Sequence, residues 1–123
     1  MDWGTERAQF WGWHNIYTYT KSIGEQILCR SGVPFTIVRP AVIESAVAFP
    51  KSGWNEGINT SAPLIFLAMR GLVKFPKADA TVLDVIPVDM VAAGMVLALC
   101  ELLEGTQRPV YQCGSSDTAP LPI

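Results

Sequence analysis

The sequence has few of the features that mark several common classes of protein. Its 9 lysines and arginines against 11 acidic residues give a net charge of −2, and no basic stripe points to a nucleic-acid partner. The 3 cysteines lie far apart without C-x-x-C spacing and there is 1 histidine, which predicts reduced, buried thiols and no metal site. The most apolar run, residues 90–100, is too short to span a bilayer and lies between Asp89 and Glu101.

Two kinds of N-terminal segment are also missing. The first residues, MDWGTERAQF, carry charge throughout and do not resemble a signal peptide, so we expect a cytoplasmic protein. No glycine-rich turn follows a strand and opens a helix, which is the arrangement that holds the pyrophosphate of a dinucleotide. We therefore expect residues 1–123 to form a single partial domain, the C-terminal half of a unit whose dinucleotide-binding half is missing.

The residues that are present predict an α/β fold. Half of the 123 residues are hydrophobic, enough to build a buried core. Apolar periodicity and turn residues predict helices at 5–12, 14–31, 61–73 and 89–103, strands at 34–38, 81–86 and 109–113, and a long loop at 40–60. The alternation of helices and strands indicates a doubly wound, Rossmann-like parallel sheet. The last of these helices is apolar almost all round, which predicts that it is buried.

Two tyrosines precede a lysine in the second expected helix, IYTYTKSIGEQIL. Residues four apart share a helix face, whereas residues two apart point to roughly opposite sides. Tyr17 therefore lies over Lys21, and Tyr19 lies on the polar side of the helix. An ammonium group next to a phenol stabilises the phenolate, which suits acid/base chemistry. The spacing alone is a weak motif, because an exposed tyrosine–lysine pair is also ordinary surface.

Four longer strings make the pattern more specific. They are WGWHNIYTYTKSIGEQIL, GVPFTIVRPAVIESAVAFPKSGWNEG, LDVIPVDMVAAGM and VYQCGSS. Together, over about residues 5–116, they resemble the extended short-chain dehydrogenase/reductases, and among these the fatty acyl-CoA reductase (male-sterility type) branch. The resemblance implies NADPH-dependent reduction of a long-chain fatty acyl thioester, carried by CoA or acyl carrier protein, to an aldehyde and often to the alcohol.

The resemblance also implies roles for individual residues. Tyr17 corresponds to the general acid, and Lys21 to the residue that assists it and hydrogen-bonds the nicotinamide ribose. The backbone that lines the nicotinamide corresponds to Pro40, Ala41, Val42 and Ile43. The family's glycine-rich turn and its upstream serine or threonine have no counterpart here, so the chain alone is expected to be inactive.

The loop after these residues is expected to contact the substrate. It follows the carboxyl end of a strand, where open α/β sheets bind ligands. Val47, Phe49 and Trp54 are the expected acyl contacts, although packing explains Trp54 equally well. Asp84 and Asp89 are expected to serve structure, Asp89 as the N-cap of the helix that follows it.

Three interpretations of function remain open at this point. The first is the acyl-thioester reductase, and the second is a nucleotide-sugar epimerase or dehydratase with the same tyrosine–lysine pair. The third is a non-catalytic remnant or interaction module. The strings GWHNIYTYTK and FPKSGWNEG favour the reductase. Unpaired apolar strand edges would also be compatible with a homo-oligomer.

Overall fold

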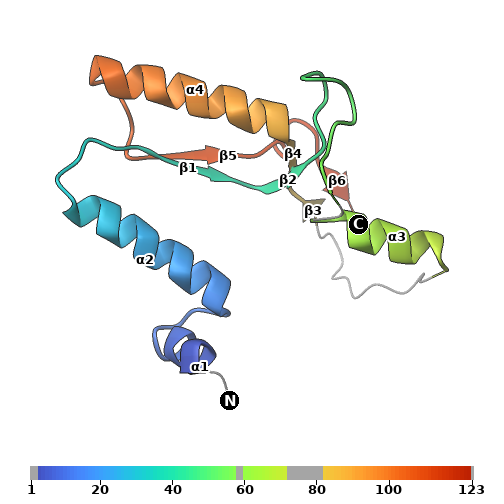
Figure 1. Ribbon diagram of the computed structural model, residues 1–123, viewed down its shortest axis with the longest axis horizontal. Coiled ribbons are helices and arrows are strands. Elements are labelled where there is room, and N and C mark those ends of the chain that lie inside the picture. Colours follow the sequence, from blue (N-terminus) through green and yellow to red (C-terminus); the bar gives the residue numbers. More distant parts are fainter. Residues whose placement is uncertain (1–2, 58–59, 72–81, 123) are drawn as a thin grey trace.

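The computed structural model describes residues 3–57, 60–71 and 82–122. Strands run across the middle of the molecule, with α4 on one side of them and α2 on the other (Figure 1). The helices are α1 (Trp3–Phe10), α2 (Ile16–Arg30), α3 (Ala62–Met69) and α4 (Val88–Glu104). The strands are β1 (Ile37–Pro40), β2 (Val42–Glu44), β3 (Val82–Leu83), β4 (Val85–Pro87), β5 (Val110–Cys113) and β6 (Leu121–Pro122). The fold is therefore of the α/β class, as predicted.

Two parallel strand pairs form the centre of the fold. β1 pairs with β5, and β2 pairs with β4. Only Ala41 separates β1 from β2, so one extended stretch changes its partner there. The Ala41 N–H donates to the Cys113 carbonyl at 2.8 Å, and the next N–H, that of Val42, donates to the Asp84 carbonyl at 3.0 Å. β3 and β6 form a short antiparallel pair. Parallel strands joined through a helix, here β4–α4–β5, are typical of doubly wound α/β folds.

Asp84 interrupts what the sequence predicted as one strand at 81–86. Its carboxylate Oδ1 accepts from the backbone N–H of Ser115 at 2.9 Å and of Ser116 at 3.0 Å. The hydrogen bond from Ser115 is the main reason that the pKa of Asp84 is lowered. The prediction of a single strand was wrong. The Asp84 carboxylate binds the backbone of Ser115 and Ser116, whereas the Asp84 carbonyl accepts from Val42, so the chain changes its partner at this residue. Residue 81 lies outside the described residues.

Helix α2 begins and ends at residues whose local chemistry explains the boundaries. Asn15 is the N-cap, and its Oδ1 accepts from the Thr18 N–H at 2.9 Å. Gly32, just beyond the C-cap Ser31, has φ of 72°, a conformation that favours glycine and stops the helix. The predicted helix at 14–31 is thus confirmed to within two residues.

Strand boundaries fit the prediction less well. The predicted strand at 34–38 is found at β1, three residues later, because its partner β5 begins only at Val110. The Ile37 N–H accordingly makes the first backbone hydrogen bond of this pair, to the Pro109 carbonyl at 3.1 Å. The predicted loop at 40–60 contains β2, which pairs with β4. The predicted helix at 61–73 is α3, eight residues long, and residues 72–73 lie outside the described residues.

The predicted burial of α4 is wrong for most of its surface. Among the described residues, the buried apolar side chains are Ala8, Ala46, Ile86, Val91 and Ala98. α4 packs against β1, β4 and β5 along one side only, so that Leu103 on its other surface is 80% exposed. For the same reason Cys100 is exposed, and Cys29 on α2 is exposed as well. All three thiols are free, as predicted, but these two are not buried.

Candidate functional site

The tyrosine–lysine pair lies in the first turns of α2. The Lys21 Nζ is 5.3 Å from the centroid of the Tyr17 ring, which confirms that the two side chains share one helix face. Tyr17 is 66% exposed, whereas Tyr19 is half-buried and lies on another face. An exposed phenol next to an ammonium can reach a bound ligand. The catalytic roles of the pair stay a prediction.

An ion pair connects α2 to the central strands. The Arg39 Nε on β1 donates to the Glu25 Oε1 at 2.8 Å, and the Arg39 Nη2 contacts the other carboxylate oxygen. This hydrogen bonding lowers the pKa of Glu25. Figure 1 shows α2 running opposite to β1, so its first turn lies toward the carboxyl ends of the strands. The turn that carries Tyr17 is therefore at the end of α2 that faces the same way as the carboxyl ends of the strands, where parallel α/β sheets bind ligands.

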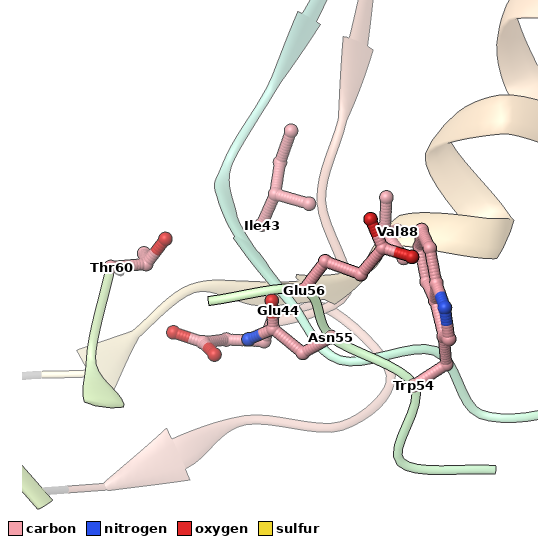
Figure 2. A pocket seen from close by; sticks show the side chains of 7 residues that line it. All are labelled: Ile43, Glu44, Trp54, Asn55, Glu56, Thr60 and Val88. Carbon is pink, nitrogen blue, oxygen red and sulfur yellow. The ribbon is translucent and has the colours of Figure 1, made fainter. Parts of the chain in front are cut away.

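A pocket of about 330 Å³ lies at the carboxyl ends of β2 and β4. Its size falls within the range typical of small-ligand sites. Figure 2 shows Trp54 beside Val88 and Thr60 on the opposite side, with Ile43 between them. The full lining is Ile43, Glu44, Trp54, Asn55, Glu56, Thr60 and Val88. Apolar and hydrogen-bonding groups thus meet in one cavity, which suits a ligand with both kinds of surface.

Hydrogen bonds to carboxylates and backbone hold the walls of the pocket. Glu44 accepts from the Ser61 N–H at 2.9 Å, which anchors the segment that carries Thr60. The Ala46 N–H donates to the Trp54 carbonyl at 3.1 Å, and the Gly53 N–H donates to the Ala46 carbonyl at 2.8 Å. These bonds close the loop of residues 46–54 at its base, where Trp54 joins the pocket wall.

Asp89 is not the helix N-cap that the sequence predicted. Pro87 is the N-cap of α4, and Asp89 lies in the first turn. Its carboxylate accepts from the backbone N–H groups of the loop at residues 47–49. The hydrogen bond from Phe49, followed by that from Ala48, lowers the pKa of Asp89 to about 2. The prediction of a structural role is confirmed, but the carboxylate caps the loop instead of its own helix.

The structure places the predicted cofactor residues inside the sheet. Pro40 ends β1, Ala41 is the step between strands, and Val42 and Ile43 belong to β2. The predicted loop at 40–60 would have placed these residues beyond the end of a strand, which is wrong, because the chain pairs with β4 and continues as a strand. Of the four, Ile43 lines the pocket.

The predicted substrate residues separate into two groups. Trp54 lines the pocket, whereas Val47 and Phe49 do not, and Phe49 is 76% exposed. Among the hydrogen bonds, ion pairs and ring contacts of the described residues, none joins Tyr17 or Lys21 to the pocket.

Besides Ile43 and Trp54, sequence reasoning did not select the five other residues that line the pocket: Glu44, Asn55, Glu56, Thr60 and Val88. Val88 directly follows β4, so pairing β4 with β2 would have placed it at the pocket. No comparable signal marks Glu56 or Thr60, which reach the pocket through the course of a loop.

A second cavity, of about 420 Å³, lies between β1 and α4. It is lined by Thr36, Val38, Met95, Val96, Ala98, Leu99 and Leu102. This lining is almost wholly apolar and offers no titratable group. The pocket at the strand ends is the better candidate for chemistry, because a reaction site needs polar groups that fix the orientation of its ligand, and this pocket contains them.

No helix in the part of the chain that the structure describes has the length and apolar character needed to cross a bilayer. Within the same residues, no three histidine, cysteine, aspartate or glutamate side chains gather as they would around a metal ion.

Parallel strand pairs, a crossover helix and a pocket at the strand ends define the class first: an α/β domain of the kind that binds nucleotide cofactors. The family comparison is more specific, since residues 1–95 match the NAD-binding family described as male sterility protein. The chain belongs to this family, whose ligand is a nicotinamide dinucleotide. No solved structure matches the chain significantly.

Several curated proteins resemble the chain over nearly its whole length. Fatty acyl-CoA reductase 8 of Arabidopsis thaliana is 39% identical over 96% of the chain and 25% of its own length. The alcohol-forming fatty acyl-CoA reductase of Simmondsia chinensis is 35% identical over 99% of the chain and 26% of its own length. The chloroplastic fatty acyl-CoA reductase 2 of Arabidopsis thaliana is 38% identical over 98% of the chain. The chain spans about a quarter of the length of these relatives.

Proposed function

We propose that the chain is part of an enzyme that uses NADPH to reduce a long-chain fatty acyl thioester to an aldehyde and onward to the alcohol. The observation that supports this most strongly is its similarity, over almost every residue, to proteins named fatty acyl-CoA reductases. The name of the Simmondsia chinensis protein states the alcohol as product for that relative. Either CoA or acyl carrier protein would carry the acyl group.

The described residues fit the nicotinamide end of the cofactor. Lys21 and Tyr17 present an ammonium and a hydroxyl from one exposed helix face, which are suitable hydrogen-bond partners for a ribose. The backbone of residues 40–43 is the proposed nicotinamide wall. The described glycines between a strand and a following helix, Gly53 and Gly57, lie in the long loop between β2 and α3, and neither of them directly follows the strand and opens the helix. The pyrophosphate would therefore depend on residues outside those described.

The proposed chemistry assigns the proton to Tyr17. When bound, NADPH would supply a hydride to the thioester carbonyl carbon, which would leave negative charge on the oxygen. Tyr17 donates its phenolic proton to that oxygen, and Lys21 stabilises the resulting phenolate. The hemithioacetal then breaks its C–S bond, which releases the aldehyde and the carrier thiol. The loop that carries Trp54 would hold the thioester against this centre.

We also propose that residues 1–123 form one partial domain. The exposed apolar side chains of α4 support this, because a complete domain covers such a surface with further elements. A cytoplasmic location stays a prediction, since one relative is named as chloroplastic.

The proposal is tested on the full-length protein that contains this segment. With a long-chain acyl-CoA, it should oxidise NADPH and form aldehyde or alcohol, measured by absorbance and by mass spectrometry of the product. The 123-residue chain by itself should neither bind NADPH tightly in calorimetry nor turn over. Conversion of a nucleotide sugar by the full-length protein, without thioester reduction, would support the epimerase or dehydratase alternative instead. Tight NADPH binding by the short chain would contradict the partial domain.

A further inference from the structure

Three consecutive backbone N–H groups of the loop at residues 46–54 point at one carboxylate. The Val47 N–H donates to the Asp89 Oδ1 at 3.1 Å. The Ala48 and Phe49 N–H groups donate to the Asp89 Oδ2 at 2.8 Å and 3.0 Å. Asp89 is half-buried and belongs to α4, about 40 residues further along the chain. A carboxylate with several backbone donors is a strong, charge-assisted acceptor.

The same loop is closed at its base by Ala46, which is buried. Ala46 exchanges hydrogen bonds with the returning part of the loop, at Gly53 and Trp54. Gly53 has φ of 76°, which allows the chain to turn back there. Asp89 thus holds the outgoing part of the loop and Ala46 holds the returning part, and Trp54 is the last residue of this closure.

We propose that Asp89 is a positioning residue for the pocket: its carboxylate fixes the loop at residues 47–49 and thereby sets the place of Trp54 in the pocket wall. The consequence for substrate rests on the proposed function, because it takes the pocket as the place where the acyl thioester binds. Phe49 and Val47 are exposed, so apolar packing does little to hold this part of the loop. The hydrogen bonds to Asp89 are the contacts that order it.

Asp84 provides a matched control within the same chain. Its carboxylate also accepts two backbone N–H groups, from Ser115 and Ser116, and its pKa is lowered for the same reason. Unlike Asp89, it contacts neither the loop at 46–54 nor a residue of the pocket lining. Replacing either aspartate with asparagine therefore removes a charged acceptor of backbone hydrogen bonds. Of the two carboxylates, only that of Asp89 holds the loop next to the pocket.

Lys51 makes the state of the loop measurable without any enzyme assay. It is exposed within the loop, and its carbonyl accepts from the Trp54 N–H at 3.1 Å. Trypsin cleaves after lysine, and cleavage within an ordered loop requires local opening. In the full-length protein, Asp89→Asn should speed cleavage after Lys51 on the order of tenfold relative to both wild type and Asp84→Asn.

The kinetic arm uses the same three proteins with NADPH and a long-chain acyl-CoA. Asp89→Asn should raise the KM for the acyl thioester on the order of tenfold, because a displaced wall misplaces substrate, while the KM for NADPH is unchanged. Asp84→Asn should leave both values as in the wild type. Asp89→Glu keeps the charge and should restore most of the protection at Lys51, and it carries the test if Asp89→Asn does not fold.

Two results would overturn the inference. One is equal cleavage after Lys51 in Asp89→Asn and Asp84→Asn. The other is faster cleavage in Asp89→Asn with a thioester KM equal to that of Asp84→Asn, which would show that the loop does not serve the site. A wild-type protein without thioester reduction would instead refute the proposed function, and the trypsin comparison would still decide whether Asp89 orders the loop.

Discussion

The tyrosine–lysine pair and the pocket differ in how the chain builds them. Tyr17 and Lys21 lie one turn apart on α2, and their contact depends only on helix geometry. The pocket combines β2, the loop at 54–56, Thr60 and the start of α4. Its walls depend on hydrogen bonds between residues 17 and about 40 positions apart. A local spacing therefore predicts the first, whereas only the folded chain produces the second.

Under the proposed function, the two regions would have separate tasks. The pair would perform proton transfer and hold the nicotinamide ribose, and the pocket would bind the thioester. Substitutions in α2 should then change turnover and cofactor affinity, and substitutions at the pocket should change substrate affinity.

The largest effect is expected for Tyr17→Phe, which removes the proposed proton donor and keeps the ring. Turnover of the full-length enzyme should fall about 10²-fold or more, the range typical of lost acid/base catalysis. Tyr19→Phe is the matched control, since Tyr19 lies on a different face of the same helix. Steady-state kinetics decides, and a larger loss in Tyr19→Phe would show that the wrong tyrosine was assigned.

Lys21→Met should lower both turnover and NADPH affinity, each by about tenfold or more, because one ammonium serves the ribose and Tyr17. The pH dependence of turnover should change as well, since the variant can no longer stabilise a phenolate. Calorimetry with NADPH and a pH–rate profile measure the two effects. A variant with normal affinity and a normal profile would remove Lys21 from the site.

Trp54→Ala should act on the substrate alone and so separate the pocket from the pair. Removing the indole opens one wall, so the KM for the acyl thioester or the preference for chain length should change by roughly threefold to tenfold. NADPH affinity should stay at the wild-type value. If neither substrate parameter moves across a series of acyl-CoA lengths, Trp54 serves packing only.

The smallest effect is expected for Glu25→Gln, which breaks the ion pair between α2 and β1. Both side chains are partly exposed, so the melting temperature should fall by at most a few degrees, and less at high salt. Arg39 lowers the pKa of Glu25, so the pair stabilises the fold at neutral pH, and this contribution is lost as the pH falls through the lowered pKa. Thermal melts of variant and wild type should accordingly converge in acid. A large loss at neutral pH would mean that the pair, not the packing around it, holds α2 in place.

Local chemistry made several parts of the fold predictable. Helix α2 begins after Asn15 and ends before Gly32. The apolar periodicity of the sequence indicates the start of this helix, and the glycine indicates its end. α4 follows its apolar pattern to Glu104 and ends at Gly105, with φ of 72°. Helix ends depend on residues within a turn of one another, so a single sequence carries the needed information.

Strand boundaries were less predictable because a strand begins and ends where its partner does. β1 starts opposite β5, more than 70 residues away, and the strand at 81–86 breaks where Asp84 turns to Ser115. The apolar pattern of these segments suits several registers equally well.

By itself, the sequence determined the α/β class, the face that Tyr17 shares with Lys21, and the likeness to the reductase family. These depend on periodicity, spacing and residue identity, which a chain carries whether or not it is folded. Only the tertiary structure decided that Asp89 holds the loop at residues 47–49, that Trp54 reaches the pocket and Phe49 does not, and that α4 is covered on one side. Each of these depends on which distant segment supplies the hydrogen-bond or packing partner, and that choice is made by the fold as a whole.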